Sequence, residues 1–373
     1  MLDASTSARL IEGFANLSIG NVIMMLVGGA LIYLAIAREY EPVLLLPIGA
    51  GCIMANIPMT GMTEGEGLFK ILYDAGIKNE LFPLLVFVGV GAMTDFGPLL
   101  ERPYTVILGA AAQFGIFGAF LMATLMGFNL KEAASIGIIG SADGPTSIYV
   151  ASALAPQLLA PIAVAAYSYM SLVPIIQPPI IRLLTTPSER AIAMPYTEKP
   201  VSKTTKIVFP ILVTVVCGLI APMSAPLIGM LMFGNLLREA GVVERLKSAA
   251  ENELINIVTF FLGITIGSTM GAAEFLNQRT LFVLGMGLLA FALDTVAGLG
   301  FGKALCLLTR GKVNPLIGAC GISAFPMSAR VIHRMGLEAN PRNYLIMHAM
   351  GSNTAGQVGS VIAGGAVLAL LAR

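Results

Sequence analysis

The residues with the clearest chemical potential lie in residues 136–147, IGIIGSADGPTS, where one carboxylate stands among small and apolar residues. Gly140, Gly144 and Pro145 prevent a long regular helix, because glycine destabilises a helix and proline interrupts its hydrogen bonds. Irregular backbone at membrane depth is tolerated only where it is buried in protein or lines a watery cavity, and a carboxylate there indicates a functional site. We therefore expect Asp143 to bind a hard cation such as Na⁺, or a proton. The alternative is a helix-capping aspartate at a kink.

A second broken stretch, residues 317–328 (IGACGISAFPMS), matches the first without gaps at an offset of 181 residues. Around it stand the neutral oxygens of Asn314 and Ser323 and the guanidinium of Arg330. A hairpin can bring Asn314 and Ser323 together, so both are candidate neutral ligands of the cation. Alternatively, Asn314 caps a short helix that starts at Pro315, and Arg330 is a charge that extends to the membrane surface.

Other polar residues inside apolar runs are weaker candidates. Asp294 lies in the middle of a predicted span and could be a second ligand. Asn56 and Asn235 end short apolar runs, where an amide can satisfy broken backbone. Tyr167 and Tyr169 share a span with serines, and one of them would face the site. The sequence leaves open which one, and packing is the usual role of a tyrosine there.

The composition decides the class of protein. The chain has 373 residues, of which 56% are hydrophobic and 12% charged, with a mean hydropathy of +0.84. Because soluble domains are about 25% charged, this chain is a polytopic membrane protein. A net charge of +1 gives no argument for nucleic acid. The sequence contains no phosphate loop or nucleotide motif, so the chain by itself is no ATP-driven pump.

The apolar pattern starts again after a polar linker. We predict a first repeat at 1–184 and a linker at 185–206, followed by a second repeat at 207–373. Each repeat would hold one re-entrant hairpin, near 131–155 and near 312–333 respectively. Paired interrupted segments in two related halves are typical of secondary transporters and indicate where the substrate binds.

Two further matches support the duplication. Residues 47–56 match residues 226–235 at an offset of 179, and residues 91–109 match residues 267–285 at an offset of 176. The alternative is that glycine and leucine recur by chance in apolar sequence. Three matches in the same order at nearly constant offset favour duplication.

The distribution of Lys and Arg predicts how the repeats are oriented. If each hairpin is re-entrant, about five segments of each repeat cross the membrane, and an odd number inverts the second repeat. With the N-terminus outside, 16 of the 22 Lys and Arg fall on the inner side and 6 on the outer side, as the positive-inside rule requires. The predicted fold is therefore an all-α polytopic membrane protein built from two inverted repeats.

Three long stretches resemble one known family, the β subunits of the biotin-dependent, sodium-pumping decarboxylases. They are IGIIGSADGPTSIYVASALAP, VNPLIGACGISAFPMSAR and GLEANPRNYLIMHAMGSNTAGQVGS. The family includes the oxaloacetate, methylmalonyl-CoA, glutaconyl-CoA and malonate enzymes, and the resemblance covers nearly the whole chain. One departure is Ser141, where many members have glycine. The N-terminus is shorter than in oxaloacetate members, which favours an acyl-CoA enzyme.

The resemblance implies a membrane subunit that removes CO₂ from carboxybiotin and couples this step to Na⁺ export and proton consumption. The essential aspartate of the family, which handles Na⁺ and protons, corresponds to Asp143. The family's asparagine, glycine and serine carry over to Asn314, Gly318 and Ser323, which with Asp143 are the expected Na⁺ ligands.

The resemblance also implies a catalytic set and partners. The family's arginine and tyrosine carry over to Arg330 and Tyr169, with Arg330 and Asn314 expected to bind carboxybiotin and Tyr169 to supply a proton. The biotin would be carried by another subunit. Expected partners are a biotin-carrier subunit, a carboxyltransferase subunit, a small membrane-anchor subunit and further copies of this chain, with a trimer suspected. The expected location is the bacterial cytoplasmic membrane.

Two other functions must be weighed. A stand-alone, ion-coupled carrier of an organic anion would fit inverted repeats and opposed hairpins equally well, but it would need no biotinylated partner. A purely structural membrane anchor is a poor match, because an anchor has no use for an intramembrane aspartate.

Overall fold

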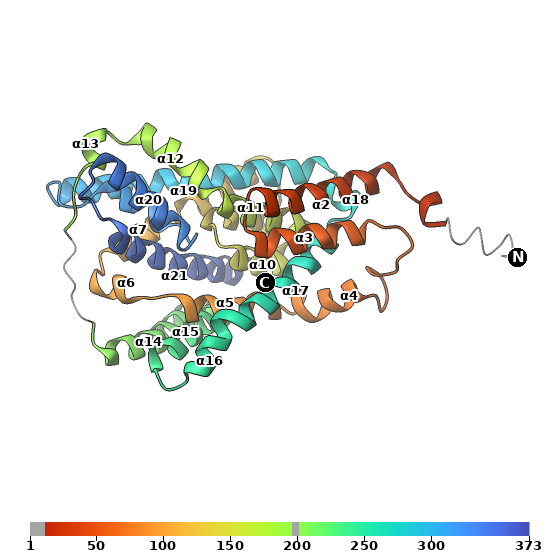
Figure 1. Cartoon of the computed structure of the whole chain (residues 1–373), viewed down its shortest axis with the longest axis horizontal. Coiled ribbons are helices and arrows are strands. Elements are labelled where there is room, and N and C mark those ends of the chain that lie inside the picture. Colours follow the sequence, from red (N-terminus) through yellow and green to blue (C-terminus); the bar gives the residue numbers. More distant parts are fainter. Residues whose placement is uncertain (1–11, 196–200, 373) are drawn as a thin grey trace, which may run out of the picture.

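The computed structural model describes residues 12–195 and 201–372, so residues 196–200 of the predicted linker lie outside it. All regular structure in these ranges is helical, which confirms the all-α prediction. Six helices there are long and apolar enough to cross a membrane, or up to eight spans if each of two bent helix pairs counts as one. Figure 1 shows most of the long helices lying roughly along the longest axis of the molecule. The chain is a multi-pass membrane protein.

The first half of the described chain contains these main helices: α2 (Ile19–Ala37), α3 (Pro42–Ala55), α4 (Leu68–Leu72), η1 (Tyr73–Ile77), α5 (Leu81–Met93), α6 (Gly97–Glu101), α7 (Thr105–Ala111), α8 (Phe114–Leu125), α9 (Leu130–Gly137), η2 (Ile138–Ser141), α10 (Gly144–Leu154), η3 (Pro156–Leu158), α11 (Leu159–Ser171), α12 (Val173–Leu184) and α13 (Pro187–Arg190). The second half contains α14 (Lys203–Ile220), η4 (Pro222–Ser224), α15 (Ala225–Ala240), α16 (Glu244–Ala249), η5 (Ala250–Leu254), α17 (Ile255–Ser268), α18 (Ala272–Phe275), α19 (Gln278–Leu308), η6 (Pro315–Gly321), α20 (Met327–Ala339) and α21 (Ile346–Leu371).

Both broken stretches interrupt the helices where the sequence predicted. In the first broken segment (residues 130–154), α9 tightens into the 3₁₀ turn η2, and Ala142 then adopts a left-handed conformation with φ 54° before α10 begins. In the second broken segment (residues 314–339), η6 is followed by a non-helical stretch and then by α20. The tips of the two segments meet, because the Ser323 N–H donates to the Ser141 carbonyl at 2.9 Å; this contact is called the crossing below.

One apolar stretch contains a sharp bend. In residues 161–184, α11 ends at Ser171 and α12 starts at Val173, with an angle of 66° between the two helices, so the stretch is either a broken span or a re-entrant loop. The physical reason is Pro174, which lacks an N–H and fits only the first turn of a new helix. Both α11 and α12 are shorter than a straight apolar span of about 20 residues.

The two halves contact each other through reciprocal helix pairs. Helix α3 packs against α17, and α5 packs against α15. Glycine allows both contacts: a Cβ at Gly51 would lie 2.1 Å from the Ile264 carbonyl oxygen, and one at Gly91 would lie 1.9 Å from that of Leu231. Small residues let helix backbones approach closely where lipid provides no hydrophobic driving force.

Two asparagines close these pairs with equivalent hydrogen bonds. Asn56, which follows α3, donates to the Met270 carbonyl at 2.8 Å, and Asn235 in α15 donates to the Thr94 carbonyl at 2.8 Å. The expectation that these amides satisfy broken backbone is confirmed, because Met270 and Thr94 each lie just beyond the last helical residue of α17 or α5.

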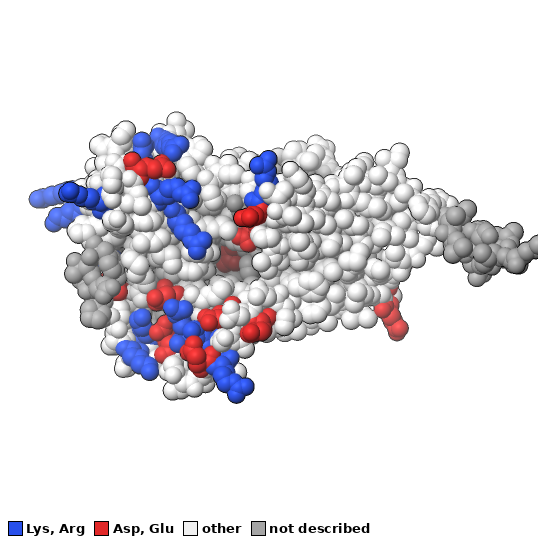
Figure 2. Space-filling view, in the orientation of Figure 1, with Lys and Arg blue, Asp and Glu red and all other residues white. Residues whose placement is uncertain are grey.

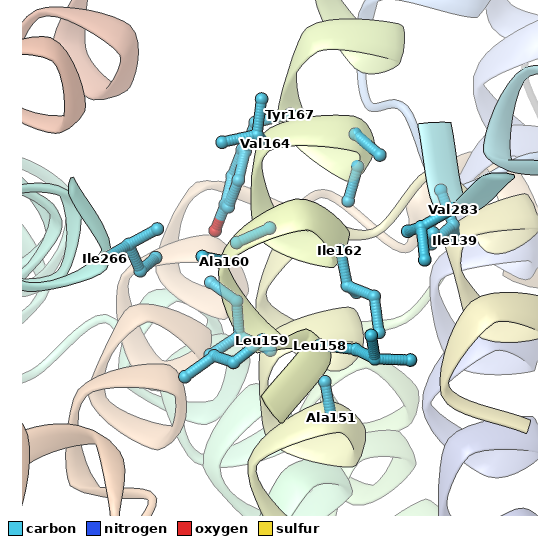
Figure 3. Close-up of a cluster of buried hydrophobic side chains, with 14 of the residues drawn as sticks. Ile139, Ala151, Leu158, Leu159, Ala160, Ile162, Val164, Tyr167, Ile266 and Val283 are labelled. Atoms are coloured by element: carbon cyan, nitrogen blue, oxygen red, sulfur yellow. The ribbon is translucent and has the colours of Figure 1, made fainter. Parts of the chain in front are cut away.

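The largest buried cluster surrounds α11. In Figure 3, Ile162 of α11 lies on the side of Ile139 of the first broken segment and Val283 of α19, and Ile266 of α17 lies on the opposite side of α11. These side chains are largely buried and aliphatic, so α11 is held between segments from both halves. The first broken segment is therefore embedded in protein, as irregular backbone at membrane depth must be.

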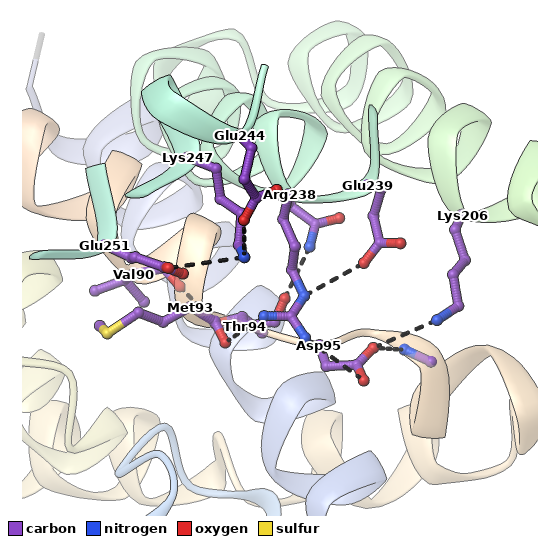
Figure 4. A network of polar contacts seen from close by, with 12 residues as sticks. Val90, Met93, Thr94, Asp95, Lys206, Arg238, Glu239, Glu244, Lys247 and Glu251 are labelled. Atoms are coloured by element: carbon purple, nitrogen blue, oxygen red, sulfur yellow. Dashed lines mark hydrogen bonds and ion pairs between the residues drawn. The ribbon is translucent and has the colours of Figure 1, made fainter. Parts of the chain in front are cut away.

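Charged side chains gather at one end of the molecule. In the face shown in Figure 2, Lys and Arg lie mostly over the left half, where α12, α13, α14 and α20 are found, and most of the right half is uncharged. Figure 4 shows one such network, in which Asp95 lies 3.9 Å from both Lys206 and Arg238. This network ties the end of α5 to α14 and α15.

The reciprocal asparagines give a test of the packing between the halves. Asn56→Ala and Asn235→Ala should each lower the unfolding free energy by about 1–3 kcal/mol, because each leaves a buried carbonyl without its donor. Asn252→Ala is the matched control, since its exposed amide bonds only within its own surface helix; it should cost less than about 0.5 kcal/mol. Thermal unfolding of the purified protein in detergent measures the difference. Equal stability of all three variants would contradict the assignment.

Candidate cation site at the crossing of the broken segments

Asp143 starts helix α10 and is buried, with 7% of its surface exposed. Gly144 and Pro145 occupy the first turn of this helix, and Asp143 Oδ1 accepts a hydrogen bond from the Thr146 N–H at 3.2 Å. The capping role weighed from the sequence is therefore real. It uses only one carboxylate oxygen and leaves the other to face different elements.

The second carboxylate oxygen joins three parts of the chain. Asp143 Oδ2 accepts from the Ser360 hydroxyl at 2.8 Å and from the Ser323 hydroxyl at 3.3 Å. Ser323 belongs to the second broken segment and Ser360 to α21. The structure thus brings together the two predicted residues Asp143 and Ser323, and it adds a serine that the sequence analysis did not single out.

No ion pair among the described residues involves Asp143. Its partners are the neutral donors of Thr146, Ser323 and Ser360. A buried carboxylate without a positive partner is unfavourable unless it binds a cation or a proton. Carboxylate and hydroxyl oxygens are the ligands that hard cations prefer. The arrangement can therefore take a small cation between groups that now bond to each other.

A cavity of about 330 Å³ reaches this carboxylate. Asp143, Tyr167, Ser323 and Gln357 line it together with two further carboxylates, Glu41 and Glu251. Figure 2 shows a hollow in the middle of the molecule with acidic atoms in and beside it. A cleft lined by one sign of charge raises the local concentration of the opposite ion.

The structure separates the two tyrosines that the sequence could not distinguish. Tyr167 is buried in the cavity beside Asp143, and its ring packs against Gly144, where a Cβ would come within 2.2 Å of it. Tyr169 points elsewhere and donates its hydroxyl to the Leu284 carbonyl of α19 at 2.5 Å. Tyr167 is therefore the tyrosine adjacent to the carboxylate.

Asn314 and Gly318 lie in the second broken segment but bond to other elements. The Asn314 amide donates to the carbonyls of Arg190 and Ile192, and its oxygen accepts from the Leu316 N–H. Gly318 lies in backbone contact with α19, where a Cβ would come within 2.0 Å of the Gly298 carbonyl oxygen. None of these hydrogen bonds joins Asn314 to Ser323. The structure therefore does not bring the two residues together in the way the sequence predicted. The 3₁₀ helix η6 separates the two residues along the chain.

Arg330 lies on the first turn of α20 with an exposed side chain. It does not line the cavity that contains Asp143. One turn further along the same helix, Arg334 is also exposed. The structure thus presents the guanidinium of Arg330 outside the cavity.

Sequence reasoning missed the polar face of α21. Asn353 donates to the carbonyls of Ile322 and Cys320, Gln357 accepts from the Thr94 hydroxyl, and Ser360 bonds to Asp143. Spacings of four and three residues place Asn353, Gln357 and Ser360 on one side of a helix. That spacing in an otherwise apolar span was the signal that could have found them.

Known proteins match nearly the whole length of this chain. Residues 20–371 match the family described as the Na⁺-transporting oxaloacetate decarboxylase beta subunit. The chain belongs to this family.

The chain is 54% identical over 362 residues to the methylmalonyl-CoA decarboxylase subunit beta of Veillonella parvula, covering 97% of this chain and 96% of the relative. It is 52% identical to the glutaconyl-CoA decarboxylase subunit beta of Acidaminococcus fermentans, covering 99% and 98%. It is 45% identical to the oxaloacetate decarboxylase beta chain of Klebsiella pneumoniae, covering 95% and 96%. The resemblance drawn from the motifs is confirmed, and the chain is a decarboxylase subunit of a sodium-pumping family.

Ser360 gives a test of the site that does not depend on the sequence predictions. Ser360→Ala removes one oxygen from the Asp143 cluster, so the Na⁺ concentration for half-maximal activity should rise roughly 10- to 100-fold, the equivalent of 1.5–3 kcal/mol for a hydrogen bond to a charged group. Ser152→Ala, which loses only a local bond to the Tyr149 carbonyl, is the control. An unchanged Na⁺ titration in the Ser360 variant would remove Ser360 from the site.

Proposed function

We propose that this chain decarboxylates carboxybiotin delivered by a partner subunit and couples that reaction to the export of Na⁺. The observation that carries the proposal is the position of Asp143. It is a buried carboxylate with neutral partners, where the two broken segments cross. Such an arrangement suits a cation that must be bound and released, because no fixed positive charge competes with it.

Na⁺ reaches Asp143 through the cavity. Glu41 and Glu251 attract the cation electrostatically, and the hydroxyl of Ser323 and the amide of Gln357 offer neutral oxygens on the way. At the crossing, Na⁺ takes the place of hydroxyl protons as the partner of Asp143 Oδ2. The hydroxyls of Ser323 and Ser360 then rotate so that their oxygens face the cation.

The decarboxylation step consumes a proton. When the bond between the ureido nitrogen and the carboxyl carbon of carboxybiotin breaks, CO₂ leaves and the electron pair remains on the nitrogen, which must be protonated. Asp143 exchanges a proton for Na⁺ during the cycle. Tyr167 lies beside it in the cavity, while the family resemblance assigns proton supply to Tyr169.

Carboxybiotin binds first at Arg330. A guanidinium holds a carboxylate through two parallel hydrogen bonds, and the side chain of Arg330 is exposed, where a biotin on a mobile carrier can reach it. Asn314 supports this end of the second broken segment through its bonds to Arg190 and Ile192. Asn314 and Gly318 are further candidates for Na⁺ coordination in a second state of the segment.

The architecture that supports transport is a pair of inverted repeats, each of about five spans with one re-entrant hairpin, at 1–184 and 207–373. The hydrogen bonds of Asn56 and Asn235 support it. Asn56 of the first half bonds to the second half, and Asn235 of the second half bonds to the first half in the equivalent way. The reciprocal packing of α3 with α17 and of α5 with α15 supports it in the same way. Movement of one group of helices against the other would open Asp143 to each side in turn.

The chain works within a complex in the bacterial cytoplasmic membrane. Its partners are a biotin-carrier subunit, a carboxyltransferase subunit and a small membrane-anchor subunit, with further copies of this chain forming a trimer. The higher identity to the acyl-CoA decarboxylase subunits than to the oxaloacetate chains supports an acyl-CoA as the substrate of the whole complex. A stand-alone anion carrier is not favoured by the relatives. Co-purification of a biotinylated protein with this chain separates the two functions.

The first test of the proposal is Asp143→Asn. The amide keeps the shape of the carboxylate but removes the charge that binds Na⁺, so Na⁺-stimulated decarboxylation should be lost while the complex still assembles. Asp95→Asn, the same change in the surface network with Lys206 and Arg238, is the matched control and should keep normal Na⁺ dependence. Activity is measured against Na⁺ concentration in the purified complex. Normal Na⁺ dependence in the Asp143 variant would refute the proposal.

The second test separates carboxylate binding from membrane topology at Arg330. Lysine keeps the charge but cannot form the planar, two-pronged contact. Arg330→Lys should therefore lose most decarboxylation of carboxybiotin while Na⁺ binding persists. Arg334→Lys, one turn away on the same exposed face of α20, is the control and should stay active. If the Arg330 variant turns over carboxybiotin at the wild-type rate, this arginine does not bind it.

A further inference from the structure

A second buried carboxylate, Asp294 of α19, lies against the first broken segment and has no part in the mechanism above. Its surface is fully buried. Oδ1 accepts a hydrogen bond from the Gly115 N–H at 2.5 Å, at the start of helix α8. Negative charge is favourable at a helix N-terminus. Asp294 therefore caps, from a different part of the chain, the helix that begins after the break between α7 and α8.

The other oxygen of Asp294 faces the first broken segment. A Cβ at Gly140 would lie 2.7 Å from Oδ2, and a Cβ at Gly115 would lie 2.2 Å from Oδ1. Both positions accept only glycine at this distance, so the carboxylate fits closely between two backbones. Oδ2 has no hydrogen-bond partner within the described part of the chain. A buried acceptor without a donor costs stability, which favours a functional reason for keeping it.

The same contact occurs at the second broken segment with a different side chain. Gln113 donates to the carbonyls of Gly109, Gly321 and Gly356, and it is also buried. Gln113 and Asp294 are separated by 181 residues, and so are Gly140 and Gly321. Each broken segment is thus touched at the equivalent glycine by the equivalent polar residue of the other half. The amide bonds to its segment, whereas the carboxylate bonds to α8 and only abuts its segment.

We propose that Asp294 is a positioning residue for Na⁺ binding: it holds α8 and Gly140 at one point of α19 and thereby sets where Asp143 stands. Gly140 precedes Asp143 by three residues. Between them, the Ser141 carbonyl accepts a hydrogen bond from the Ser323 N–H at the crossing. A shift at Gly140 therefore moves the carboxylate of Asp143 relative to the hydroxyls of Ser323 and Ser360. Asp294 itself contacts none of these side chains through a described hydrogen bond.

The two contacts differ in how they hold their segments. Gln113 donates one hydrogen bond to the Gly321 carbonyl of the second broken segment, at 3.4 Å, while Asp294 meets the first segment without one. Asp294 therefore holds Gly140 by close packing alone.

The inference rests on the proposed role of Asp143, and the experiment keeps the two apart. Activity of the purified holo-complex is titrated with Na⁺ for Asp294→Ala, Asp294→Asn, Gly140→Ala and the double variant Gly140→Ala/Asp294→Ala. Asp294→Ala and Gly140→Ala should each raise the half-maximal Na⁺ concentration roughly 2- to 30-fold, the range for residues that act on a site without touching its ligand. Asp294→Asn, which keeps the shape and the acceptor for Gly115, should give the smaller shift. Asp95→Asn is again the control.

The double variant gives the decisive comparison. Because the added Cβ at Gly140 collides with Oδ2 of Asp294, the shift caused by Gly140→Ala should be smaller when Asp294 is already Ala. Additive shifts would overturn the proposal, and so would normal Na⁺ titrations in well-assembled single variants. If the Asp294→Ala complex fails to assemble, the Na⁺ titrations of Asp294→Asn and Gly140→Ala test the proposal, since both variants keep the acceptor for the Gly115 N–H that caps α8. If Asp143→Asn also retains Na⁺ dependence, the proposed function fails first; if only the Asp294 and Gly140 shifts are missing, this inference alone fails.

Discussion

A carboxylate buried among membrane helices needs a cation, a proton or a set of donors, because its charge is otherwise unfavourable by several kcal/mol. Asp143 meets this constraint with neutral donors from three elements: Thr146 of its own helix, Ser323 of the second broken segment and Ser360 of α21. Neutral donors stabilise the charge without cancelling it. The site therefore retains affinity for a cation, and its geometry exists only while the three elements stay together.

The rest of the architecture keeps those elements together. Backbone carbonyls freed where α5, α17 and η6 end receive hydrogen bonds from Asn235, Asn56 and Asn353. Glycines at the helix contacts permit close approach of α3 to α17 and of α5 to α15. Each interruption is satisfied by a side chain from a distant segment. A movement that separates the segments thus has to break defined hydrogen bonds, which limits the protein to a few discrete arrangements.

The sequence predicted features that depend on local chemistry. An interruption between Gly140 and Pro145, a buried carboxylate at Asp143 and amides that end short spans are properties of single stretches, and the structure contains all of them. It could not predict which distant group fills each break. Ser360 was missed because it lies in an unbroken apolar helix. Asn314 was expected near Ser323, but the fold places it against Arg190 and Ile192 of the linker, and this contact between distant segments cannot be read from the local sequence. Likewise, apolar length alone could not show that Pro174 starts a new helix after a bend rather than lying inside one straight helix.

The most direct test of the Asp143 site is a pair of structures of the purified complex, one determined at saturating Na⁺ and one without Na⁺. We predict a bound ion in the Na⁺ structure that is coordinated by Asp143 Oδ2 and the hydroxyl oxygens of Ser323 and Ser360, with the direct bonds between these groups replaced by contacts to the ion. Without Na⁺, the hydrogen bonds described above should return. A Na⁺ ion found elsewhere, with the Asp143 cluster unchanged between the two conditions, would contradict the account.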